Sequence, residues 1–208
     1  MRSKIIGTIC LILGIVIIVT SSTTFAFYAV TVSTNGDDIT GQTLNFDVRL
    51  NSSILYKATQ LVPLNDSLID EAITKTTNKC IDNKGYEVCS LYSLTLTNNG
   101  DAQVLNGYVS TANTTYTTDN LMCQLFDSNY NPVSDVVTLS RVAGEKKYFQ
   151  KNNIRIATEV NNRDVTYYLA IWLHETNELQ NEDYAKTFAG EVVFESLYGD
   201  KISASFSS

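Results

Sequence analysis

The stretch YSLTLTNNG, residues 92–100, decides the fold class of this chain. Its first six residues alternate apolar and polar side chains, so an extended strand here would bury Tyr92, Leu94 and Leu96 on one face. The three residues that follow, ending at Gly100, tolerate positive φ and predict a turn. A strand with one buried face that runs into a tight turn is typical of an antiparallel sheet.

The same alternation recurs along most of the chain and predicts roughly nine to eleven strands. Turn-forming residues separate the segments, and the connections are mostly short. Together the segments predict an all-β protein, an antiparallel sandwich or barrel. They are TLNFDVRL (43–50), VLNGYVS (104–110), LMCQLF (121–126), PVSDVVTL (132–139), NIRIATEV (153–160), VTYYLAIWL (165–173), FAGEVVFESL (188–197) and KISASFSS (201–208).

Two stretches depart from this pattern. In VPLNDSLIDEAI, residues 62–73, apolar side chains recur at helical spacing after a cap at Asn65 or Asp66, which predicts one short helix. HETNELQNEDYAKT, residues 174–187, is polar and has no period. It predicts a long surface loop with room for one helical turn.

The first residues predict an N-terminal hydrophobic helix that directs export. Arg2 and Lys4 precede an apolar run over residues 5–19. The run has the length of a signal-peptide core and is short of the ~20 residues that span a bilayer. A small-x-small pattern at Thr24 and Ala26 predicts cleavage after Ala26.

Residues 1–26 are therefore either a signal peptide or an uncleaved signal anchor. In both cases residues 27–208 form a single exported domain, extracellular or at the cell surface, and only the N-terminal segment meets the membrane. The chain holds 15 Lys and Arg against 22 Asp and Glu, a net charge of -7. Since no basic cluster occurs, nucleic acid is excluded as a partner.

Export makes disulfides chemically possible. Cys80 and Cys89 flank a turn built on residues 82–85, so a hairpin closed by a disulfide is one interpretation. The other interpretation is that Cys80, Cys89 and Cys123, the cysteines of the exported part, are all free thiols. Cys123, in LMCQLF, has the surroundings of a small buried hydrophobe.

Motifs of catalysis and metal binding are missing from the sequence. His174 is the one histidine, and HETNE has Glu178 where a zinc-protease helix needs its second histidine. No Gly-x-Ser-x-Gly elbow occurs. We therefore expect no catalytic residue, no bound metal and no cofactor, and we expect that the protein is not an enzyme.

The segment DSNYNP places Asp127, Asn129 and Asn131 at the spacing of a calcium loop. Pro132 stands where that loop needs Gly, and Thr138 where it needs a bidentate Glu. An EF-hand is excluded, and a hairpin turn is favoured over a looser calcium site, which stays open. In TYYLAIWL both faces are apolar, which favours a central strand buried on two sides over an aromatic ligand platform.

The order of these segments resembles that of the camelysin and TasA-like proteins, the secreted biofilm-matrix family of Gram-positive bacteria. The resemblance is carried by TTFAFYAVTVS after the leader, then ITGQTLNFDV, SLYSLTLTNNGDAQVL, YYLAIWLHE and KTFAGEVVFES. It implies a jelly-roll-like sandwich, export to the surface and fibre-forming members. Some relatives carry a metalloprotease label, but no histidine pair supports that activity here.

In such fibres the segment after the leader is similar to a donor strand that enters the next subunit. Here Tyr28, Val30 and Val32 share one face of that segment, and Thr31 and Ser33 share the other. A strand at a free terminus can complete its own sheet or the edge of a neighbour. The predicted donor strand comprises Phe27, Tyr28, Ala29, Val30, Thr31, Val32 and Ser33.

Three functions follow as hypotheses. The first is an exported, non-enzymatic structural protein of the bacterial surface or extracellular matrix, whose partners are further copies of itself and other surface or matrix proteins. The second is a membrane-anchored surface module that binds glycan or peptide. The third and most remote is a camelysin-like metalloprotease.

Overall fold

The computed structural model describes residues 29–30, 41–42, 45–156 and 163–208. The chain divides into two compact units, Met1–Leu44 and Asn45–Ser208. In the first unit, β1 (Ala29–Val30) pairs antiparallel with β2 (Gly41–Gln42). The second unit holds the sandwich, and the rest of the description concerns it alone.

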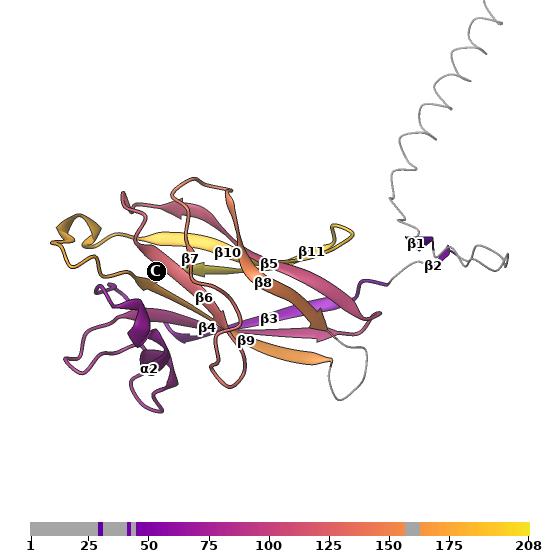
Figure 1. Ribbon diagram of the computed structural model, residues 1–208, viewed down its shortest axis with the longest axis horizontal. Coiled ribbons are helices and arrows are strands. Elements are labelled where there is room, and N and C mark those ends of the chain that lie inside the picture. The colour runs from indigo at the N-terminus through magenta and orange to yellow at the C-terminus, as the bar shows by residue number, and fades with distance from the viewer. Residues whose placement is uncertain (1–28, 31–40, 43–44, 157–162) are drawn as a thin grey trace, which may run out of the picture. The chain divides into compact units, whose positions relative to one another are not determined.

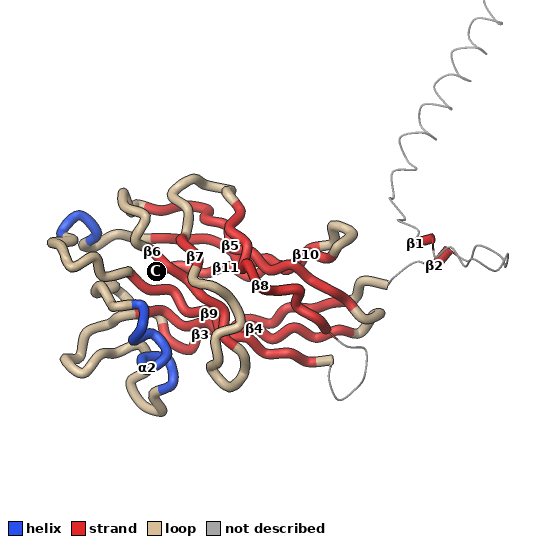
Figure 2. Tube along the Cα trace, viewed as in Figure 1, coloured by secondary structure: helices blue, strands red, loops and turns tan. Residues whose placement is uncertain are grey.

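Two antiparallel sheets form the second unit (Figures 1 and 2). The four-stranded sheet has the order β11 (Lys201–Ser207), β10 (Phe188–Ser196), β5 (Gln103–Thr114) and β8 (Lys146–Ile156). The five-stranded sheet has the order β3 (Val48–Tyr56), β4 (Cys89–Asn98), β9 (Asp164–Leu173), β6 (Leu121–Phe126) and β7 (Val137–Thr138). The predicted all-β sandwich is confirmed.

The connections give the sandwich a jelly-roll order. From β4 to β10 the chain changes sheet at every step except between β6 and β7. As a result β4 pairs with β9 and β5 pairs with β10, although these strands are far apart in sequence. Such interleaving of two sheets is what distinguishes a jelly roll from a simple meander.

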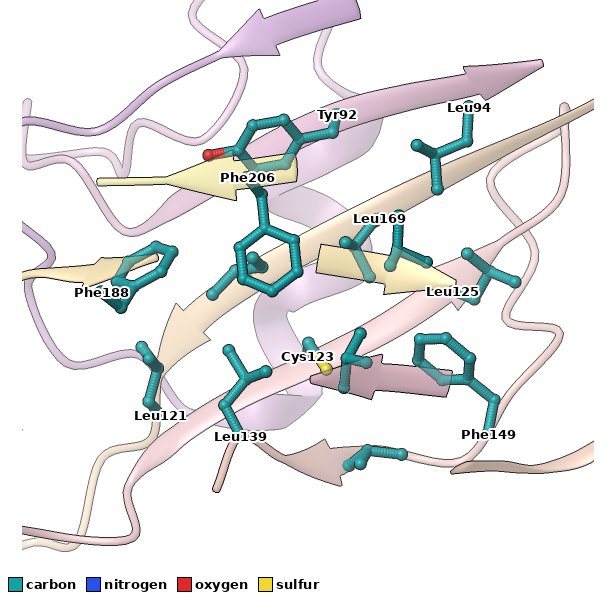
Figure 3. Packing of buried hydrophobic residues seen from close by; sticks show 14 of the residues in the cluster. Tyr92, Leu94, Leu121, Cys123, Leu125, Leu139, Phe149, Leu169, Phe188 and Phe206 are labelled. Carbon is teal, nitrogen blue, oxygen red and sulfur yellow. The ribbon is translucent and has the colours of Figure 1, made fainter. Parts of the chain in front are cut away.

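The main core lies between the sheets (Figure 3). Tyr92, Leu94 and Leu96, the alternating residues of the opening stretch, are all buried there, as predicted. The turn after them is also formed, and the Gly100 N–H donates to Asn98 Oδ1 at 3.0 Å. A Cβ at Gly100 would lie 2.2 Å from the backbone oxygen of Asn45, so glycine is required by this close approach.

A second apolar cluster covers the outer face of the five-stranded sheet. The predicted short helix is present as η1 (Asp66–Leu68) and α2 (Ile69–Thr74), and Asn65 Oδ1 caps it by accepting from the Ser67 N–H at 3.1 Å. The buried face of α2 joins Ala170 and Trp172 of β9 in this cluster. Strand β9 is therefore buried on both faces, as predicted, and Trp172 offers no free aromatic platform.

Strand lengths differ from prediction at three places. In the segment 132–139 only Val137–Thr138 is a strand. Ser134 explains this, because its hydroxyl accepts from the Leu125 N–H at 2.8 Å and its carbonyl accepts from the Gln124 amide at 2.7 Å. Hydrogen bonds of this kind, which involve side chains, replace the backbone ladder of a regular strand. Strand β3 continues through NSSILY to Tyr56, and β8 begins at Lys146, and neither extension was predicted. The loop 174–187 holds one helical turn, η2 (Asn181–Asp183), as its composition allowed.

Candidate functional site

The cysteines that flank the predicted turn are bonded to each other. Cys80 and Cys89 form a disulfide with their Cα atoms 4.8 Å apart, and both are buried in the outer cluster. The turn between them is fixed by Asp82, whose Oδ1 accepts from the N–H groups of Lys84 and Tyr86 at 2.8 Å. Cys123 is a free thiol in the inter-sheet core, and burial raises its pKa.

His174 has a structural contact. Its Nδ1 lies 2.9 Å from Asp66 Oδ1, and the same oxygen accepts the indole N–H of Trp172 at 2.7 Å. Asp66 therefore ties the start of the helical segment to the end of β9. Among the residues that the structure describes, no group of three His, Cys, Asp or Glu side chains is placed to hold a metal ion.

The calcium-like segment forms a turn. Asp127 Oδ1 accepts from the N–H groups of Asn129 and Asn131 at 2.8 and 2.9 Å, and Asp127 Oδ2 accepts from the Asn131 amide at 3.1 Å. These bonds use the oxygens that a calcium ion would need. The favoured turn interpretation thus accounts for the side chains of Asp127 and Asn131.

The predicted donor strand lies mostly outside the described residues. Only Ala29 and Val30 are described, in the ladder with Gly41 and Gln42. The predicted cleavage point after Ala26 also lies outside the described part. No helix within the described residues has the length and apolarity to cross a membrane.

The sandwich itself has an open edge where the two sheets differ in width. The five-stranded sheet ends at β3, and the four-stranded sheet ends at β11. Tyr92 of β4 reaches β11, since its ring lies 6.2 Å from that of Phe206 and its hydroxyl donates to the Ser207 carbonyl at 2.7 Å. Strand β11 lies beside β3 without pairing to it, and it also contacts β4 through Tyr92.

Strand β3 nevertheless exposes part of its inner face. Ser52 and Ile54 pair with Leu94 and Tyr92, so their side chains point to the inner face of the sheet. Yet both are exposed, Ile54 to 59%. An inward-facing isoleucine that meets water is apolar surface that a further strand would bury. We name the exposed inner face of β3 and the free edge of β11 the open seam.

One side of the β11 backbone is available for pairing with a further strand. The Ser196 N–H donates to the Asp200 carbonyl, and the Ser208 N–H donates to the Phe188 carbonyl, which fixes the alternation of paired groups along the hairpin. It follows that the N–H and C=O groups of Lys201, Ser203 and Ser205 point away from β10. No described strand pairs with that side of β11. At one end of the seam, Lys57 Nζ lies 3.2 Å from Ser207 Oγ.

Glu87 holds the end of β3 that borders the seam. Its carboxylate accepts from the Tyr56 hydroxyl at 2.8 Å, the Thr59 hydroxyl at 2.7 Å, and the N–H groups of Thr59 and Gln60 at 2.8 and 3.1 Å. Burial alone would raise the pKa of Glu87, but these hydrogen bonds outweigh it and lower the pKa below its usual 4.5. Burial and the bond to Glu87 raise the pKa of Tyr56 to about 12.

Glu87→Gln is expected to lower the free energy of unfolding by about 1–2 kcal/mol at neutral pH, because the amide supplies one acceptor where the carboxylate supplied two. Since the folded-state pKa is lowered, the stabilisation by Glu87 is present above pH 4.5 and is lost as the pH falls through the folded value. Urea unfolding of both proteins between pH 7 and pH 3 measures this. The stability gap should narrow at acid pH, and a gap that stays constant would contradict the assignment.

The fold and its edges define the class of protein: an antiparallel, jelly-roll-ordered β-sandwich with one open seam. No protein-family model matches the chain, and no curated protein matches it either. Three solved structures show distant likeness. A lipoprotein from Bacteroides thetaiotaomicron is 8% identical, over 84% of this chain and 86% of that one, with a TM-score of 0.32.

The ApaA protein from Bordetella pertussis is 12% identical, over 78% of this chain and 92% of that one, with a TM-score of 0.20. The KRT10-binding region domain of the pneumococcal serine-rich repeat protein PsrP is 9% identical, over 78% of this chain and 99% of that one, with a TM-score of 0.24. At TM-scores this low, the likenesses carry no statement about function.

Proposed function

We propose that this chain is an exported, non-enzymatic structural protein of the bacterial surface or extracellular matrix, whose copies assemble by strand exchange. The observation that carries the proposal is the open seam. An exposed, inward-facing Ile54 and a free strand edge over residues 201–205 form an acceptor for one additional β-strand.

Residues 27–33 fit such an acceptor. Tyr28, Val30 and Val32 alternate with polar neighbours, so a strand formed by this segment has one apolar face. Paired with β11, that face would cover Ser52 and Ile54 while its backbone bonded the free groups of β11. Insertion into a neighbour is a heterologous, head-to-tail contact, which repeats into a filament unless it closes into a ring.

The donor half of the proposal is tested with the full exported chain carrying Tyr28→Ser, Val30→Ser and Val32→Ser. Each change removes an apolar side chain worth more than about 1.4 kcal/mol on burial, so the critical concentration for filaments should rise well over tenfold. Sedimentation and electron microscopy give the readout. The matched control, Thr31→Ala with Ser33→Ala, alters the other face and should assemble as the unmodified chain does.

The acceptor half is tested by Ser203→Pro. Proline removes an N–H that points to the free edge of β11 and leaves the β10–β11 ladder bonded, so the chain should fold and fail to assemble. Ser203→Thr is the control. Mass spectrometry of the N-terminus shows whether each variant is exported and cleaved after Ala26. Strand exchange would be refuted if the triple serine variant or Ser203→Pro formed filaments at the same concentration as the unmodified chain.

A further inference from the structure

A pocket of about 250 Å³ opens on the outer face of the four-stranded sheet. Its floor is formed by outward-facing positions of three neighbouring strands, since Ser110 of β5 pairs with Glu191 of β10, and Glu191 pairs with Ser205 of β11. Its wall is the turn at Ala143 and Gly144. The pocket is separate from the open seam, which involves the inner face of β3 and the backbone edge of β11.

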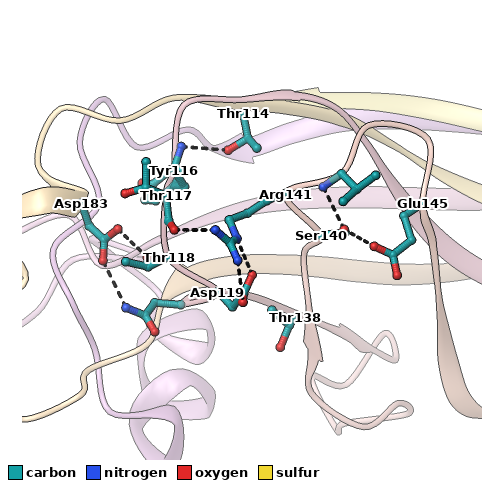
Figure 4. A network of polar contacts seen from close by, with 12 residues as sticks. Thr114, Tyr116, Thr117, Thr118, Asp119, Thr138, Ser140, Arg141, Glu145 and Asp183 are labelled. Atoms are coloured by element: carbon teal, nitrogen blue, oxygen red, sulfur yellow. Dashed lines mark hydrogen bonds and ion pairs between the residues drawn. The ribbon is translucent and has the colours of Figure 1, made fainter.

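The wall is held in place by polar contacts (Figure 4). Arg141 bonds Asp119 Oδ1 at 2.7 Å and the Thr117 carbonyl at 2.7 Å, and the Val142 N–H donates to Ser140 Oγ at 3.0 Å. The Gly144 N–H then donates to the Thr111 carbonyl at 2.9 Å. The pocket is thus formed before any ligand arrives, which is typical of small-molecule sites.

Two polar side chains that line the pocket have no partner among the described residues. Glu191 and Ser110 make no side-chain hydrogen bond or ion pair there, and Ser110 is only 8% exposed. Buried polar groups in native proteins normally have partners, so these groups mark a place where a ligand can supply them.

The chemistry of the lining selects the ligand. Two hydroxyls and one carboxylate offer both donors and acceptors, which match a neutral polyol better than an anion, because Glu191 repels negative charge. Lys146 does not offset that charge, since its Nζ bonds Glu195 at 3.3 Å. An apolar cavity of about 150 Å³ already holds benzene, so about 250 Å³ accommodates a six-membered ring with hydroxyl substituents.

An aromatic side chain stands beside the pocket on the same face. Tyr148 of β8 pairs with Tyr108 of β5, one row of outward side chains along from Ser110. The two tyrosine rings lie 5.1 Å apart, and Lys146 Nζ lies 4.6 Å from the Tyr108 ring. Tyr108 is covered by these neighbours, whereas Tyr148 is 48% exposed. A planar, exposed ring next to a hydroxyl-lined pocket suits the apolar face of a second sugar.

We propose that this pocket is a saccharide-binding site, which places one sugar ring against Glu191, Ser110 and Ser205 and the next ring against Tyr148. The site is independent of strand exchange. It would let a surface or matrix protein hold polysaccharide while its edges hold other copies of the chain.

The test uses the full exported chain purified from its host and saturation-transfer NMR. The probes are glucose, galactose, mannose and N-acetylglucosamine, then cellotetraose and chitotetraose. At least one monosaccharide should bind with a Kd of about 1 mM, and its tetrasaccharide more tightly. Binding of n-butylamine without binding of any sugar would show a cation site and overturn the proposal, as would the absence of binding by every probe.

Matched variants place the binding in the pocket. Ser205→Leu fills it from an exposed position of β11 and should raise the Kd at least about tenfold. Ser203→Leu makes the same change two residues away on the same face, outside the pocket, and should leave the Kd unchanged. Tyr148→Ala should weaken the tetrasaccharide about tenfold and spare the monosaccharide. Equal effects of the two leucine variants would refute the site.

Discussion

Trp172→Ala is expected to lower the free energy of unfolding by about 4–5 kcal/mol, the largest effect of any single substitution that we predict. Trp172 is fully buried on the outer face of β9, where it packs with the cluster under α2. Truncation would leave a large cavity in that cluster. It would also remove the indole N–H that donates to Asp66 Oδ1 at 2.7 Å, so the start of the helical segment would lose one of its ties to the sheet.

Trp172→Phe separates these two contributions. Phenylalanine keeps most of the apolar volume and removes the donor, so we expect a cost of about 1–3 kcal/mol. Because Trp172 is the one tryptophan of the chain, urea unfolding must be followed by circular dichroism. A cost below about 2 kcal/mol for Trp172→Ala would contradict the view that α2 and β9 form one cooperative core.

Removal of the disulfide by Cys80→Ala with Cys89→Ala is expected to cost about 3 kcal/mol, as the chain-entropy model gives for a short loop. The two cysteines lie in the same outer cluster as Trp172, and the Val88 N–H donates to the Cys80 carbonyl at 2.8 Å. Without the cross-link, we expect the hairpin and α2 to lose protection against hydrogen exchange before the inter-sheet core does.

Cys123→Ala is the control for this double variant. It removes a buried sulfur that is not cross-linked, so it should cost about 1 kcal/mol through lost packing alone. Reducing agent should destabilise the unmodified chain and leave the double variant unchanged. A reducing agent that has no effect on the stability of the unmodified chain would show that the cross-link does not support this part of the fold.

Local patterns predicted the elements that depend on neighbours in sequence. The alternation of Tyr92, Leu94 and Leu96 predicted a strand with one buried face, and Asn65 predicted a helix start that its side chain does cap. TYYLAIWL predicted a strand buried on two sides. These features hold because side-chain periodicity and capping act over a few residues.

The candidate seam could not be predicted in this way. In the sequence, Ile54 appears as one more apolar residue, and KISASFS appears as a final strand with Ile202, Ala204 and Phe206 on its inner face. A weak signal was the run of small polar residues at alternate positions, Ser203 and Ser205, which suits an exposed strand. Nothing in the local pattern predicts that β11 lies beside β3 without pairing to it, or that Ile54 stays exposed.

Periodicity and turn chemistry are local, so they were enough to predict alternating strands with one short capped helix. The width of each sheet, the open seam between β3 and β11, and the pocket where Ser110, Glu191 and Ser205 meet became visible only in three dimensions. The reason is that these features arise from pairing between strands that are distant in the chain. The register between two strands cannot be read from the sequence of either strand alone.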